Sequence, residues 1–244
     1  MPTTEAAKAK VRIQVWDALD AANAVHTDTS HGRIPHFRGA HAAADRLANT
    51  AAWQSARTIK AVPDRAQLPV RARALAEGKT VYMAVPALAA ERPFFLLDPS
   101  RLDLTDPFEA ASSQFAAAAA PTVEVESLGS IDMIVLGSVA CDRSGTRIGK
   151  GAGYSDIEFA LLTEAGLITP ETLIVTTVHS LQVVDAAIPS TTHDVSVDLI
   201  VTPEETITCP PAPRPPGILW DHLPADKIAS IPALRARAAR RPQA

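Results

Sequence analysis

The sequence predicts an α/β protein with a three-layer, Rossmann-like fold, in which helices cover both faces of a mainly parallel sheet. Short apolar runs of strand length alternate along the chain with stretches of helical periodicity, and this alternation is typical of such folds. In sheets of this kind, ligands bind beyond the carboxyl ends of the strands. The predicted strands cover residues 58–62, 80–85, 131–136, 173–178 and 199–201.

The first helix is predicted over residues 6–24, where Val11, Val15 and Leu19 recur at the spacing of one helical face. Lys8 and Arg12 lie one turn apart near its start, so the two cations project from the same side. Their spacing alone favours a solvated face. Further helices are predicted over residues 40–51, 67–77, 107–119 and 155–165.

Length and composition indicate one globular domain with a small appendage. The chain has 244 residues, 47% of them hydrophobic and 20% charged, which is ordinary for a folded protein. We assign residues 1–208 to an α/β domain and residues 209–244 to a C-terminal extension with a basic tail. Five prolines within residues 209–217 predict an extended connector, and residues 218–235 then form a terminal element that packs back on the domain.

Charge and cysteine content argue against several classes of protein. A formal net charge of −4 does not supply the positive surface that a general nucleic-acid binder needs. Cys141 and Cys209 are far apart and suggest neither a disulfide framework nor a zinc site. Charged residues near the N-terminus and the lack of a long apolar stretch predict neither a secretory signal nor a membrane span. We therefore expect a cytoplasmic monomer or homodimer that binds neither nucleic acid nor membrane.

The most informative segment precedes the helix at 155–165 and has a glycine at every second position. Gly149, Gly151 and Gly153 leave backbone amides uncovered and free to adopt positive φ, as close approach to a polyphosphate requires. The helix that follows directs its positive end at the same place. The spacing is not that of the Walker motif, and the glycines alone also fit a flexible strand-to-helix turn.

Charged side chains around these glycines fit the binding of a phosphate chain. Arg147 and Lys150 can neutralise phosphate oxygens and stabilise the charge that develops during phosphoryl transfer. Asp156 can hold the accompanying Mg²⁺ directly or through water. The segment therefore predicts a nucleotide site.

The same segment resembles the signature of 5-formyltetrahydrofolate cyclo-ligases. The chain is most similar to the branch of this family known as methenyltetrahydrofolate synthetase domain-containing proteins, and the similarity covers nearly all of it. The phrases that carry this resemblance are 33–39 (RIPHFRG), 135–140 (VLGSVA), 147–153 (RIGKGAG), 178–179 (VH), 182–185 (QVVD), 193–194 (HD) and 197–198 (VD).

The resemblance implies an ATP- and Mg²⁺-dependent ligase that closes the ring of 5-formyltetrahydrofolate to give 5,10-methenyltetrahydrofolate. It implies that Lys8 and Arg12 reach the nucleotide phosphates, which reverses the interpretation from spacing alone. Arg147 and Lys150 would be catalytic. The nucleotide loop would comprise Gly149, Gly151, Ala152, Gly153 and Tyr154, Mg²⁺ would be bound by Asp156 and Asp198, and substrate contacts would come from Ser155, His179 and Gln182.

The chain departs from the family pattern where a folate would bind. Ser138 follows Gly137 where the family has a Pro-Gly pair, Cys141 and Ser155 stand at positions that are usually aromatic, and residues 67–70 lack the expected glutamate. Two alternatives therefore accompany folate cyclisation: an ATP-dependent ligase for a non-folate substrate, and a non-catalytic nucleotide-binding protein. For Cys141 itself the sequence predicts a small packed residue, and His193 with Asp194 fits either a site or a turn.

Overall fold

The computed structural model describes residues 3–241 and contains two sheets. The larger sheet has eight strands in the order β11-β10-β8-β5-β1-β2-β3-β4. Its five central strands run parallel, while β3, β4 and β11 pair antiparallel at the edges. The strands are β1 (Thr58–Ala61), β2 (Thr80–Ala84), β3 (Phe94–Leu97), β4 (Thr122–Val123), β5 (Met133–Leu136), β8 (Leu173–Thr177), β10 (Leu199–Val201) and β11 (Thr206–Thr208).

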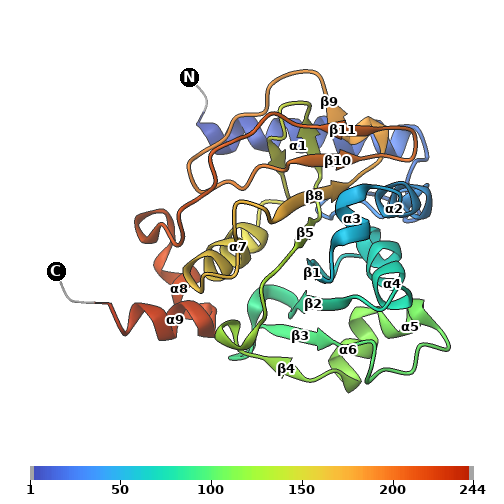
Figure 1. The fold of residues 1–244 in the computed structure, drawn as a ribbon. Helices are drawn as coiled ribbons and strands as arrows, with labels where there is room; N and C mark the ends of the chain where they lie inside the picture. The colour runs from blue at the N-terminus through green and yellow to red at the C-terminus, as the bar shows by residue number, and fades with distance from the viewer. Residues whose placement is uncertain (1–2, 242–244) are drawn as a thin grey trace.

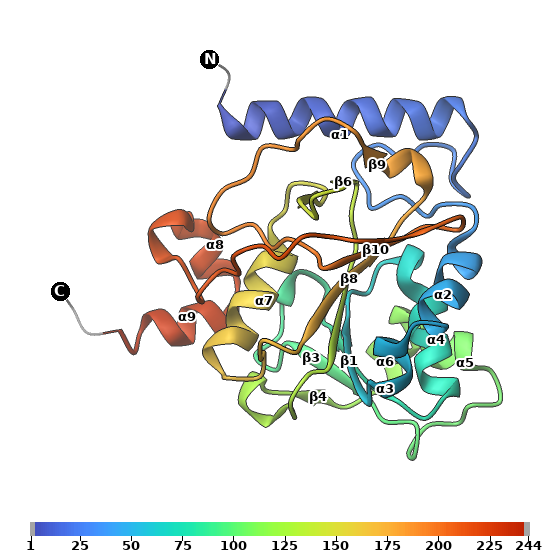
Figure 2. The same ribbon diagram turned by 45° about the horizontal axis from the view of Figure 1, so that its top comes forward.

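Helices cover both faces of this sheet, as Figures 1 and 2 show. The helices are α1 (Thr4–Ala21), α2 (Ala40–Ala48), α3 (Ala51–Ser55), α4 (Leu68–Ala76), α5 (Pro107–Ala110), α6 (Ser113–Ala119), α7 (Tyr154–Glu164), α8 (Ala225–Ser230) and α9 (Pro232–Ala238). Within residues 3–241, no helix is both long and apolar enough to cross a bilayer.

Alternate side chains of β5 are buried in two apolar cores, one on each face of the sheet. Met133 and Val135 are buried against side chains of α2 to α6, whereas Ile134 and Leu136 are buried against α7 and the C-terminal segment. Successive side chains of a strand point to opposite faces, so a fully apolar strand is expected between two helical layers. The predicted three-layer fold with a mainly parallel sheet is confirmed.

The predicted helix at 40–51 ends early at Ala48 and a new helix, α3, starts at its far end, whereas the predicted helix at 107–119 is divided into α5 and α6. Thr50 accepts a hydrogen bond from the Trp53 amide at 3.2 Å and begins α3, and Ser112 accepts one from the Phe115 amide at 3.0 Å and begins α6. A side-chain oxygen at such a position satisfies an amide that the helix leaves free. The sequence pattern gave no warning of the short edge strands β3, β4 and β11.

A smaller sheet lies beside the carboxyl end of β5 and is covered by α1. It is formed by β6 (Ala140–Asp142), β7 (Arg147–Ile148) and β9 (Val183–Val184). Val15 and Leu19 of α1 pack against Val139 and Ile148 of this layer. Figure 2 shows α1 lying across the top of the molecule, above β6 and β9. This packing brings the first turns of α1 to the glycine-rich segment after β7.

The C-terminal segment covers α7. Residues 209–217 contain no helix or strand, and α8 and α9 follow. Ile231 and Leu234 are buried in the same apolar cluster as Phe159 and Leu162 of α7. The extension thus contributes to the core on that side of the sheet.

Candidate active site

A cavity of about 370 Å³ opens at the carboxyl ends of β1, β2 and β5. The residues that follow these strands, 62–64, 85–87 and Gly137, form one wall, and the glycine-rich loop forms the opposite wall. This is the edge at which an open parallel sheet binds ligands. The cavity is therefore the candidate active site.

The loop from Gly149 to Gly153 presents backbone amides to this cavity. Gly151 and Gly153 have φ values of +101° and +70°, which glycine adopts without strain. Gly153 is the N-cap of α7 and supplies no side chain to cover the first amides of the helix. Those amides and the helix dipole together favour an anion at this end of α7.

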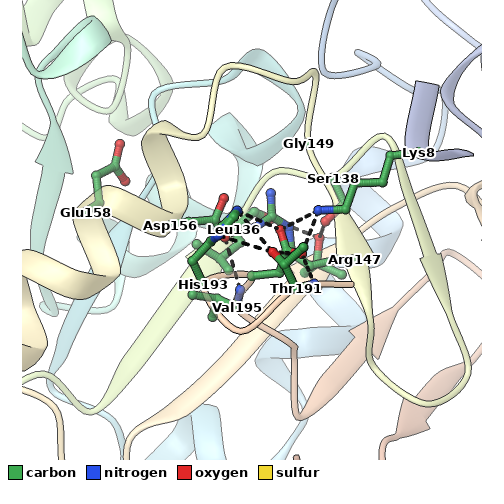
Figure 3. A network of polar contacts seen from close by, with 12 residues as sticks. Lys8, Leu136, Ser138, Arg147, Gly149, Asp156, Glu158, Thr191, His193 and Val195 are labelled. Atoms are coloured by element: carbon green, nitrogen blue, oxygen red, sulfur yellow. Dashed lines mark hydrogen bonds and ion pairs between the residues drawn. The ribbon is translucent and has the colours of Figure 1, made fainter. Parts of the chain in front are cut away.

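Arg147 lies beneath the loop and is only 4% exposed. One of its terminal nitrogens pairs with Asp156 at 3.2 Å, and Asp156 also accepts a hydrogen bond from the Val195 amide at 3.1 Å (Figure 3). The Arg147 Nε is buried and has no hydrogen-bond partner within the described residues. A buried donor without an acceptor is costly, so this nitrogen indicates that a ligand completes the site.

Side chains from the first three turns of α1 hold the loop in place. Arg12 donates from Nε to the carbonyl oxygen of Gly149 at 2.8 Å and pairs with Glu5 at 2.7 Å. Lys8 contacts both carboxylate oxygens of Asp194, at 2.7 and 2.6 Å. Both cations line the cavity while each is already engaged by the protein.

Asp194 is the centre of a second set of contacts. Burial raises the pKa of its carboxyl group, but hydrogen bonds from Lys8 and Thr191 outweigh this and hold the pKa below its usual value. The carboxylate is therefore ionised at neutral pH and fixes Lys8 beside the cavity. His193 also lines the cavity. Figure 3 shows Lys8 of α1 meeting the loop that carries Thr191 and His193.

A buried ion pair lies under the site, and sequence reasoning missed it. Lys60 in the middle of β1 pairs with Glu158 of α7, and both side chains are at most 5% exposed. Lys60 is level with Tyr82 and Ile134 on the neighbouring strands, on the face that α7 covers. A lysine inside an otherwise apolar strand was the available signal.

Asp64 is a further acid in the cavity that the sequence did not identify. It follows β1 and lies beside Gly137, where a Cβ on the glycine would come within 3.0 Å of its carboxylate oxygen. Burial raises the pKa of Asp64, against the opposing charges of Lys150 and Arg71. Its place directly after a strand was a usable clue.

We expect the Asp64→Asn variant to be more stable than the wild type at neutral pH. The folded state holds a proton on Asp64 more tightly than the unfolded state, so wild-type stability falls as pH rises from the ordinary pKa of 3.8 through the raised value. Thermal unfolding between about pH 4 and pH 8 should show a difference in melting temperature that grows with pH. A difference that is constant across this range would contradict the assignment.

Comparison with known proteins identifies the family of the chain. The model of the 5-formyltetrahydrofolate cyclo-ligase family matches residues 4–203. The chain belongs to this family. It is 35% identical over 240 residues to the methenyltetrahydrofolate synthase domain-containing protein of Bos taurus, covering 96% of this chain and 62% of that protein. The counterpart from Mus musculus is 36% identical over 233 residues, covering 93% and 62%. The chain thus spans less than two thirds of the length of these relatives.

A solved structure supports the fold of this cyclo-ligase family member. The NMR structure of Aquifex aeolicus 5,10-methenyltetrahydrofolate synthetase has a TM-score of 0.52 and 18% sequence identity, and the match covers 90% of this chain and 99% of that chain. The family is one of ligase enzymes, and the resemblance read from the sequence is confirmed.

Most residues that the cyclo-ligase resemblance singled out lie together in the cavity. Its lining includes Lys8, Arg12, Arg147, Gly149, Lys150, Gly151, Ala152, Gly153, Tyr154, Ser155 and Asp156, with His193 and Asp194 beside them. Their roles stay predictions. The expectation for Cys141 is met, since the side chain is fully buried and burial raises the pKa of its thiol.

Asp198 does not line the cavity, and this position does not favour its predicted assignment to Mg²⁺. It precedes β10, so it lies at the amino end of that strand, opposite the cavity edge. Its carboxylate accepts a hydrogen bond from the Ile174 amide at 2.8 Å and pairs with Arg214 at 3.0 Å. These contacts give it a structural role.

The two residues after β8 that were predicted to contact substrate do not line the cavity either. His179 accepts a hydrogen bond from the Leu181 amide at 3.1 Å and caps a short 3-10 helix. Gln182 is only 1% exposed and donates to the carbonyl oxygens of Ser138 and Val139. Neither side chain lines the cavity, because each satisfies backbone groups of the turn that joins the two sheets.

Proposed function

We propose that the chain is an ATP- and Mg²⁺-dependent cyclo-ligase-type enzyme that activates a formyl or carboxyl oxygen by phosphorylation for C–N bond formation. The leading substrate is 5-formyltetrahydrofolate. The observation that carries the proposal is the buried Arg147 Nε without an acceptor, beneath a loop of uncovered amides. A polyphosphate supplies the acceptors that this nitrogen and these amides lack.

The cations around the loop have separate roles in this proposal. Arg147 and the amides at the start of α7 bind the phosphate chain from below, and the exposed Lys150 reaches the transferred group from the side of Asp64. Preorganised donors stabilise transition-state charge because they need no reorganisation during the reaction. Lys8 and Arg12 keep the loop closed on the phosphates through Asp194 and the Gly149 carbonyl oxygen.

Mg²⁺ would be held jointly by the protein and the nucleotide. Among residues 3–241, no group of three or more His, Cys, Asp or Glu side chains is arranged to bind a metal ion alone. Mg²⁺ commonly takes one or two carboxylates together with phosphate oxygens and water. Asp156, which lines the cavity at the first turn of α7, fits that part, and the ion would neutralise charge on the phosphates.

The proposed reaction has two steps. The formyl oxygen attacks the γ-phosphorus and the bond to ADP breaks. A neighbouring nitrogen of the substrate then attacks the formyl carbon, and phosphate leaves with the former formyl oxygen. The nitrogen loses a proton, and the Asp64 carboxylate is placed to accept it, because burial brings the pKa of this acid closer to neutral.

The direct test mixes purified protein with ATP, Mg²⁺ and 5-formyltetrahydrofolate. We expect the absorbance of the methenyl product to rise together with ADP in a one-to-one ratio, and to be absent when ATP or Mg²⁺ is omitted. ATP binding without formation of ADP from any acceptor would instead show a non-catalytic nucleotide-binding protein.

A matched pair of variants tests the metal assignment. We expect Asp156→Asn to raise the Mg²⁺ concentration for half-maximal activity by about tenfold or more, as loss of a charged ligand does. Asp198→Asn should leave this concentration unchanged, because Asp198 precedes β10 and so lies at the end of that strand that is remote from the cavity. Titration of activity with MgCl₂ compares them. Equal shifts in both variants would contradict the assignment of Asp156.

A non-folate acceptor is the second candidate, and the cavity lining favours it. Among the described residues, Tyr154 is the only Phe, Tyr or Trp that lines the cavity. Flat ring systems are commonly held by stacking on aromatic side chains. Gln67 is fully buried and donates to the Thr177 carbonyl oxygen, so it does not supply the carboxylate that the family pattern places within residues 67–70. ADP formation stimulated by another formyl or carboxyl compound, but not by 5-formyltetrahydrofolate, would favour this candidate.

A further inference from the structure

A second cavity, of about 610 Å³, lies on the other side of the glycine-rich loop. It shares Gly151, Gly153 and Asp156 with the first cavity. Its inner wall is formed by α7, and its outer wall is formed by residues 217–219, 222–224, 226 and 227 of the C-terminal extension. The two cavities therefore meet at the start of α7.

The outer wall is part of the folded protein and lies beyond the region that the family model matches, residues 4–203. The Ile218 amide donates to Glu164 of α7 at 3.1 Å. The Nδ1 atoms of His193 and His222 lie 2.8 Å apart. The Lys227 ammonium lies 3.8 Å from the centre of the Tyr154 ring. These contacts join the extension to α7 and to two residues that line the first cavity, Tyr154 and His193.

We propose that this second cavity binds the base and ribose of the nucleotide, and that the C-terminal extension is its outer wall. The inference rests on the proposed function. A triphosphate on the glycine-rich loop has two ends. Its γ-phosphate must face the acceptor, and the first cavity contains Lys150 and Asp64 for that reaction. The nucleoside end then occupies the opening on the opposite side of the loop.

The lining of the second cavity suits a nucleoside. Ile157 and Ala160 of α7 and Leu223 of the extension give apolar walls for a flat base. His222 and Asp226 at the rim offer partners for ribose hydroxyls. A volume of about 610 Å³ also lies within the roughly 300–1,000 Å³ that is common for small-molecule sites.

Two variants that narrow the cavity from opposite walls test this assignment. Ala160→Met changes the inner wall and Leu223→Trp the outer wall. The exposed Ala229 of α8 lies outside the cavity, so Ala229→Met is the matched control. Calorimetric titration of each full-length variant with ATP, ADP and inorganic tripolyphosphate separates binding of the nucleoside from binding of the phosphates.

We expect both variants to lower the affinity for ATP and for ADP by about tenfold or more, because only the nucleotides fill the narrowed cavity. The affinity for tripolyphosphate should change by less than about twofold. Retained tripolyphosphate binding also shows that a variant is folded. If Ala160→Met fails to fold, Leu223→Trp carries the test alone. Unchanged ATP affinity in a folded variant would overturn the inference, as would a rise confined to the KM of the acceptor. Wild-type protein that does not bind ATP would instead refute the proposed function.

Discussion

Replacing Lys150 by alanine is expected to lower kcat/KM of the ATP-dependent reaction by about 10²- to 10³-fold, the usual effect of removing one preorganised donor from a transition state. Lys150 is exposed on the loop, and its positive charge opposes the rise in the pKa of the half-buried Asp64. It makes no hydrogen bond or ion pair within the described residues, so its removal should leave the fold intact. Steady-state ADP formation under saturating Mg²⁺ measures the effect.

Separate values of kcat and KM distinguish a role of Lys150 in phosphoryl transfer from a role in binding ATP. If Lys150 acts on the transferred phosphoryl group, kcat falls and the KM for ATP changes little. Lys10, an exposed lysine of α1 outside both cavities, supplies the control, and Lys10→Ala should retain wild-type rates. A Lys150→Ala rate within about threefold of the wild type would show that this ammonium does not contact the transferred group.

Local patterns predicted the strands and the glycine-rich loop because the residues that define them are neighbours in the sequence. The parallel strands are continuous apolar runs, and Gly149, Lys150, Gly151 and Gly153 lie within five positions. A glycine-rich turn before a helix leaves a set of free backbone amides at the start of that helix. Apolar periodicity and local glycine spacing were therefore sufficient to locate this loop, whereas its role as a nucleotide site also depended on the charged neighbours and the family resemblance.

The predicted site residues that do not line the cavity are those whose side-chain direction depends on distant partners. Asp198 comes just before a strand, which places it at the amino end, whereas ligands meet the carboxyl end. Gln182 follows a strand at the correct edge, yet it turns inward to carbonyl groups of residues 138 and 139. Periodicity carries no information about such long-range hydrogen bonds.

The two cations of α1 show what each kind of evidence contributed. Spacing alone favoured a solvated face for Lys8 and Arg12, and the family resemblance implied phosphate contacts. The structure brings both to the cavity, where Asp194 and the Gly149 carbonyl oxygen engage them. Their position could not follow from spacing, because it is set by the packing of α1 on the smaller sheet.

The buried ion pair between Lys60 and Glu158 gives the largest expected effect on stability. Lys60→Met should lower the free energy of unfolding by about 3–5 kcal/mol, since it leaves a buried carboxylate without its partner. The double variant Lys60→Met with Glu158→Leu should recover most of this loss, because apolar side chains replace both charges. Denaturant unfolding of the four proteins in this cycle measures the coupling.

The pH dependence of the single variant separates lost charge pairing from lost packing. Burial already raises the pKa of Glu158, and the charge of Lys60 opposes this. Without Lys60 the pKa rises further, so the folded state takes up a proton that the unfolded state does not hold, and stability falls as pH rises through this window. The deficit of Lys60→Met should therefore be smaller near pH 5 than near pH 8, whereas the double variant should lack this dependence. A double variant as unstable as the single one at both pH values would contradict this explanation. It would show that lost packing between β1 and α7, and not lost charge pairing, causes the loss of stability.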